Sequence, residues 1–175
     1  STPVMQKIAC LDLKGQHDQI KEEVFAAFEK VYEKTAFSGG PFVEEFENQF
    51  AGYIGSKYAV GVNNGTTALH LAMLALGIGP GDEVIIPADT FIATAWGPSH
   101  VGATPVFVDC TSDTWQIDIT KIEEKITPRT KAIIGVHLYG QPFDIEGVKA
   151  ICEKHNLFLI EDTAQAQGAR YKGTT

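Results

Sequence analysis

The run Phe158–Ala166 joins an apolar segment to a carboxylate and an amide, Asp162 and Gln165. Residues 157–160 have no polar face, which is typical of a parallel strand that helices cover on both sides. Ligands of such sheets bind at the carboxyl edge of the strands. A carboxylate that emerges there from a buried strand needs a cationic or hydrogen-bonding partner. Asp162 could equally be the N-cap of a following helix, so this stretch alone leaves both roles open.

A second motif, Asn63–Leu69, follows the first predicted strand and begins a helix. The first N–H groups of a helix have no intrahelical acceptor, and the helix dipole favours negative charge there. Gly65 lets a ligand approach the backbone closely, and Thr66 and Thr67 add hydroxyl donors. Such a helix start would suit a phosphate group. An ordinary Asn or Thr cap would leave the same pattern.

An aromatic side chain, Phe91, follows the strand-like run Glu83–Ile86 at the same predicted edge. It could stack on a planar ring or pack in the core. An anion site, an aromatic face and a carboxylate on successive strand ends are together what a phosphorylated pyridine requires: a phosphate site, a stacking surface and an acidic partner for the ring nitrogen.

The elements that would position these residues alternate along the chain. Strands are predicted at Tyr58–Val62, Glu83–Ile86, Pro105–Asp109, Ala132–His137 and Leu157–Glu161. Helical segments are predicted around Ala68–Leu76, Ile92–Trp96, Ile119–Lys125 and Ile145–Lys154. Connections of this length favour crossovers. We therefore expect an α/β unit with a mostly parallel sheet sandwiched by helices.

Two amphipathic helices are predicted before the first strand. Apolar residues recur at helical spacing from Ile20 to Tyr32, and a second helix should begin at Pro41 and end at Gly55. Together they carry more apolar surface than one flank of the sheet needs, which favours a partner subunit as their cover.

Composition excludes several classes of function. The chain has 14 basic and 22 acidic residues, a net charge of −8, so general nucleic-acid binding is not expected. Its three cysteines are far apart and its five histidines lack ligand spacing, so neither a disulfide framework nor a metal site is predicted. The apolar runs are too short to span a bilayer, and no run resembles a signal peptide. We expect a cytoplasmic protein without a membrane partner.

Eight short motifs occur in a characteristic order. They are Asp12–Lys14, Ser38–Pro41, Asn64–Leu71, Gly79–Val84, Gly102–Asp109, Thr127–Ala132, His137–Pro142 and Glu161–Ala166. This succession resembles the DegT-type (DegT/DnrJ/EryC/StrS) nucleotide-sugar aminotransferases, which are pyridoxal-phosphate enzymes of the aspartate-aminotransferase fold, fold type I.

The resemblance implies roles for individual residues. Gly65, Thr66 and Thr67 would hold the cofactor phosphate, and Phe91 would stack on the pyridine ring. Asp162 would pair with the protonated ring nitrogen, and Gln165 would donate a hydrogen bond to the phenolic oxygen. These implied roles agree with the chemistry that each residue type allows.

The resemblance also implies what this chain lacks. Residues 1–175 would comprise the N-terminal helices and most of the large, cofactor-binding domain. The rest of that domain and a C-terminal small domain would not be in this chain. The lysine that forms the family's Schiff base is expected beyond Thr175, so no catalytic residue is assigned within the chain. His137 and Lys14 could contact substrate, although a hydrogen-bonded structural histidine and a solvated lysine are the simpler interpretations.

The function implied by the resemblance is transfer of an amino group from glutamate to a nucleotide-diphosphate keto-sugar. A homodimer is implied as well, because enzymes of this fold place their active sites at a two-fold interface. Two alternatives share these motifs. One is a related dehydratase with histidine in place of the lysine, and the other is a non-catalytic regulatory homologue.

Overall fold

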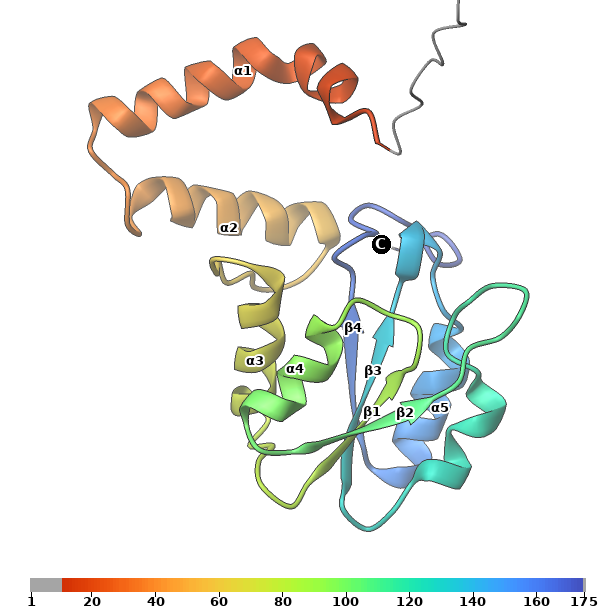
Figure 1. The fold of residues 1–175 in the computed structure, drawn as a ribbon. Coiled ribbons are helices and arrows are strands. Elements are labelled where there is room, and N and C mark those ends of the chain that lie inside the picture. Colours follow the sequence, from red (N-terminus) through yellow and green to blue (C-terminus); the bar gives the residue numbers. More distant parts are fainter. Residues whose placement is uncertain (1–10, 175) are drawn as a thin grey trace, which may run out of the picture. The chain divides into compact units, whose positions relative to one another are not determined.

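The computed structural model describes residues 11–174, which are drawn in colour in Figure 1. The chain divides into two compact units, Ser1–Phe50 and Ala51–Thr175.

The first unit consists of the two predicted amphipathic helices. Helix α1 (Leu13–Glu33) begins where the Asp12 side chain accepts a hydrogen bond from the Gly15 N–H at 3.0 Å. Helix α2 (Pro41–Ile54) begins at Pro41, as the sequence predicts, and its last turn belongs to the second unit. Both predicted helices are confirmed.

The second unit contains a four-stranded sheet in the order β2-β1-β3-β4. Its strands are β1 (Glu83–Pro87), β2 (Thr104–Val108), β3 (Thr130–Val136) and β4 (Phe158–Asp162), and all neighbours are parallel. The predicted parallel sheet is confirmed. The strand predicted at Tyr58–Val62 is wrong, because no strand forms there. Tyr58 and Val60 are 73% and 80% exposed, so the apolar side chains of this run do not pack in the core.

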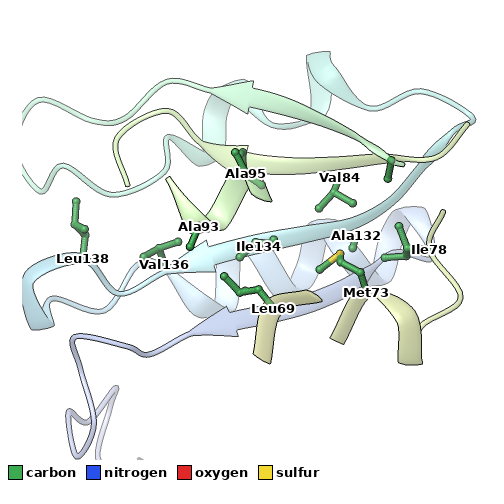
Figure 2. Packing of buried hydrophobic residues seen from close by; sticks show 12 residues of the cluster. Leu69, Met73, Ile78, Val84, Ala93, Ala95, Ala132, Ile134, Val136 and Leu138 are labelled. Atoms are coloured by element: carbon green, nitrogen blue, oxygen red, sulfur yellow. The ribbon is translucent and has the colours of Figure 1, made fainter. Parts of the chain in front are cut away.

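Helices cover both faces of the sheet, as predicted. On one face, Leu69 and Met73 of α3 (Gly65–Ala75) pack against Ala132 and Ile134 of β3, with α4 (Ala93–His100) beside them (Figure 2). On the other face, α5 (Ile145–His155) packs its Val148 on a second buried cluster. Because side chains alternate along a strand, adjacent residues such as Val84 and Ile85 serve opposite faces.

Two predicted helices differ in extent. Helix α4 continues past Pro98 to His100 instead of ending at Trp96, and Pro98 is buried within it. The segment Ile119–Lys125 forms two 3₁₀ helices, η1 (Ile119–Lys121) and η2 (Glu123–Lys125), in place of one α-helix. A run this short has few helical hydrogen bonds to offset the entropy of nucleation, so tertiary packing decides its geometry.

The end of β3 is closely packed. A Cβ atom added to Gly135 would lie 2.2 Å from Cζ of Phe143, which is fully buried. Phe143 follows the 3₁₀ helix η3 (Leu138–Gly140), so glycine at 135 allows the chain to return over the strand.

We expect Gly135→Ala to lower the free energy of unfolding by about 1–3 kcal/mol, the usual cost of overpacking a core. Urea unfolding measures the difference. Gly52→Ala is the matched control, because a Cβ there meets no atom within 4 Å, and its stability should be kept or raised. The double variant Gly135→Ala/Phe143→Leu should recover part of the loss. An unchanged unfolding midpoint for Gly135→Ala would contradict the close packing.

Candidate functional site

The parallel sheet brings most of the predicted site residues to one edge. Strands β1, β3 and β4 all end there, and α3 runs back toward the start of β1, so its N-terminus lies at the same edge (Figure 1). His137, Asp162 and Gln165 therefore lie at the ends of neighbouring strands. Lys14 is on α1 in the first unit, where it forms an ion pair with Asp18.

The start of α3 keeps donors available for an anion. Asn64 is the N-cap, and its Oδ1 accepts from the Thr67 N–H at 2.8 Å. The N–H groups of Gly65 and Thr66 precede the first intrahelical bond, so they have no acceptor within the helix. A Cβ on Gly65 would meet no atom within 4 Å, so the space beside it is open. The cap does not exclude an anion at this helix start, since Asn64 fills the cap and leaves the threonine hydroxyls free of it.

Phe91 lies between β1 and α4 and is 65% exposed. Its carbonyl oxygen accepts a hydrogen bond from the Thr94 N–H at 3.0 Å, near the beginning of α4. The alternative that Phe91 fills the core is therefore wrong. Its ring is available to stack on a ligand at the sheet edge.

Asp162 is the last residue of β4 and is half-buried. Its Oδ1 accepts from the Ala164 N–H at 3.0 Å, and its carbonyl oxygen accepts from the His137 N–H at 3.0 Å. No helix follows β4 within the described residues, so the helix-cap alternative is wrong and Asp162 instead closes a local turn. For Oδ2, the structure records no hydrogen bond from residues 11–174, so this oxygen can accept a further hydrogen bond.

The orientation of the Gln165 amide is set by a main-chain group. Its Oε1 accepts from the Tyr139 N–H at 2.7 Å, so its NH₂ group is the part left to donate to a ligand oxygen. Tyr139 has a left-handed backbone, with φ 56° and ψ 23°, and its side chain is 78% exposed. Sequence reasoning missed this role, because a tyrosine gives no local signal for a positive φ.

His137 is only 4% exposed, and both of its ring nitrogens contact the protein. Nε2 lies 3.2 Å from Oε2 of Glu161, and Nδ1 accepts from the Phe143 N–H at 3.3 Å. The ring also stacks on Phe143 with centroids 4.6 Å apart. These contacts favour the structural alternative over a contact with substrate.

Gln116 is, like His137, a buried polar residue near this edge. Sequence reasoning did not identify it. Its Nε2 donates to the Leu138 carbonyl oxygen at 3.3 Å, which fixes the same turn from the side of β2. Nothing in the neighbouring sequence marks the residue, because its partner is 22 positions away.

A further carboxylate, Asp109, follows β2 at the same edge. It accepts a hydrogen bond from the Cys110 N–H, and the Lys121 ammonium lies 3.3 Å away. These two interactions lower the pKa of Asp109. Its charge is thus already compensated, and two strands, β1 and β3, lie between β2 and the strand of Asp162.

Among residues 11–174, no three His, Cys, Asp or Glu side chains gather as metal ligands would. None of the described helices has both the length and the hydropathy needed to cross a membrane.

The profile of the DegT/DnrJ/EryC1/StrS aminotransferase family matches residues 18–175. The chain belongs to this family. The resemblance inferred from the eight motifs is therefore confirmed.

Three relatives illustrate the relationship. GDP-perosamine synthase of Caulobacter vibrioides is 55% identical over 136 residues, which are 78% of this chain and 37% of that protein. The S. venezuelae DesV structure with a ketimine intermediate has a TM-score of 0.93 and 44% identity, and covers 97% of this chain and 46% of its own. The PLP-form of the putative sugar aminotransferase Spr1654 from Streptococcus pneumoniae has a TM-score of 0.75 and 36% identity, over 81% of this chain and 41% of its own. This DegT-family chain thus spans less than half the length of these relatives.

In this DegT-family chain, the left-handed backbone at Tyr139 can be tested by substitution. Tyr139→Gly should change the free energy of unfolding by less than about 1 kcal/mol, because glycine adopts positive φ without strain. Tyr139→Val should lower it by roughly 1–3 kcal/mol, because a β-branched residue is strained there. Urea unfolding of both variants distinguishes the backbone from the exposed side chain. Equal losses for Gly and Val would contradict the left-handed conformation.

Proposed function

We propose that this chain forms the cofactor-binding half of a pyridoxal-phosphate-dependent aminotransferase that acts on a nucleotide-diphosphate keto-sugar. The observation that carries the proposal is the arrangement at the ends of β3 and β4. There the Asp162 carboxylate has one oxygen without a recorded hydrogen bond from residues 11–174. Three residues further on, the Gln165 NH₂ group has no recorded acceptor among the same residues. The helix start at Gly65 opens at the same edge.

The residues present fit this cofactor. The N–H groups and hydroxyls at the start of α3 would bind its phosphate, where the helix dipole adds to the attraction. The open space beside Gly65 leaves room for that group. Phe91, exposed at the end of β1, would supply the stacking surface for the pyridine ring.

Pyridoxal phosphate, when bound, supplies an electron sink for the carbanion formed when an amino substrate loses a proton. Asp162 would accept a hydrogen bond from the ring nitrogen and keep that nitrogen protonated, an interaction of roughly 1.5–3 kcal/mol. Gln165 would donate its NH₂ to the phenolic oxygen without adding charge. The Tyr139 N–H holds the amide in the orientation that this donation needs.

The remaining parts of the proposal come from the sequence. Glutamate as amino donor, the homodimer and the cytoplasmic location stay predictions, as does a substrate contact of Lys14. For His137, the buried and hydrogen-bonded ring favours the structural alternative. The homodimer is supported by the apolar side chains of α1. None of the residues of this helix is buried, and Val24, Phe25 and Phe28 are more than half exposed. An apolar helix face of this kind is suited to a partner subunit.

The full-length protein should bind pyridoxal phosphate. Titration with the cofactor should produce a visible absorption band that borohydride abolishes, since a lysine imine absorbs there and is reducible. Thr66→Val, which keeps the side-chain shape but removes the hydroxyl, should weaken binding several-fold. If the wild-type protein develops no such band, the proposed function fails.

Asp162→Asn should keep cofactor affinity within about tenfold while turnover falls roughly 10²-fold or more, because an amide does not hold the ring proton as a carboxylate does. Steady-state transamination and cofactor titration give the two numbers. Asp109→Asn is the matched control, since it makes the same change at a strand end where Lys121 already compensates the charge. Near-wild-type turnover in Asp162→Asn would contradict the role of this carboxylate.

A further inference from the structure

The imidazole of His137 is held in one tautomer by its partners. The Phe143 N–H is a donor, so the Nδ1 atom that it contacts at 3.3 Å must be the unprotonated nitrogen. The proton of the neutral ring is therefore on Nε2, which donates to the Glu161 carboxylate at 3.2 Å. Neither nitrogen is left for a substrate.

These contacts fix both ends of one short turn. At the start of the turn, the His137 N–H donates to the Asp162 carbonyl oxygen, and the His137 ring donates to the Glu161 carboxylate. These two interactions connect the start of the turn to β4. At the end of the turn, Phe143 is fully buried against Gly135, and its N–H is held by the His137 ring. The imidazole therefore bridges the two ends of the turn and the neighbouring strand.

The turn between these ends carries the group that orients Gln165. Leu138 is buried and its carbonyl oxygen is bonded to Gln116, which leaves Tyr139 at the apex with a left-handed backbone. A left-handed non-glycine residue persists only where its surroundings impose it. With both ends fixed, the Tyr139 N–H is directed at Oε1 of Gln165, at 2.7 Å.

We propose that His137 is a positioning residue: its ring, through Glu161 and Phe143, holds the turn that directs the Tyr139 N–H at Gln165, and it makes no contact with substrate. The inference rests on the proposed function for its effect on cofactor binding. Its structural part, the order of the turn, is independent of that function.

Three substitutions separate the contacts of the ring. His137→Phe keeps the stacking on Phe143 and removes both hydrogen bonds. His137→Asn keeps an acceptor near the Phe143 N–H, and His137→Gln can reach Glu161 instead. Hydrogen exchange of the peptide containing Tyr139, measured by mass spectrometry on the full-length protein, should accelerate at least tenfold in His137→Phe and by less in the other two.

The matched control is His155→Phe. His155 also pairs with a glutamate, Glu123, at 2.8 Å, but at the end of α5 and so at the opposite edge of the sheet. This variant should leave both the exchange at Tyr139 and the cofactor dissociation constant unchanged. Thermal unfolding of each variant separates local opening of the turn from global loss of stability.

The kinetic readout distinguishes positioning from substrate contact. In His137→Phe, the dissociation constant for pyridoxal phosphate should rise about tenfold while KM for the nucleotide sugar changes less than twofold. Unchanged exchange at Tyr139 together with a raised KM would overturn the proposal and assign His137 to substrate. If the wild-type protein binds no cofactor, the proposed function fails, and the exchange measurement alone then decides the role of His137.

Discussion

The parallel pairing of β3 with β4 is the interaction on which the candidate site depends. Its register sets Val136 opposite Asp162, and the next N–H, that of His137, bonds to the Asp162 carbonyl oxygen. A slip of one residue would turn every side chain of β4 to the other face and remove Asp162 from the edge. The partly buried Ile160 and Leu159 pack against the clusters on opposite faces of the sheet, and this packing opposes the slip. The core thus sets the register, and the register sets the position of Asp162.

The polar groups at this edge are linked mainly through the backbone. Gln165 is oriented by the N–H of Tyr139, Asp162 by that of Ala164, and α3 begins on a side-chain cap. Side chains that would contact a ligand are therefore supported by main-chain groups in the turns that follow β3 and β4 and by the cap of α3. Such support is what a site needs to hold several ligand contacts at once.

Sequence patterns predicted the parallel sheet, both leading helices and the placement of Asp162 and Gln165 at one edge, because these features follow from local periodicity and strand order. They failed at Tyr58–Val62, where an apolar composition does not show whether the side chains are buried. They also missed Gln116, Glu161 and the left-handed Tyr139. Each of these residues acquires its role from a partner distant in the sequence, so no local pattern reveals it.

The use of main-chain donors has an evolutionary consequence. A point mutation can replace a side chain, but it removes an N–H only by introducing proline. The donors at Gly65, Thr66 and Tyr139 therefore survive most substitutions at their own positions, whereas a single substitution removes an exposed side chain such as the ring of Phe91. A scaffold organised in this way can change its exposed side chains while the main-chain donors at the strand and helix ends stay in place.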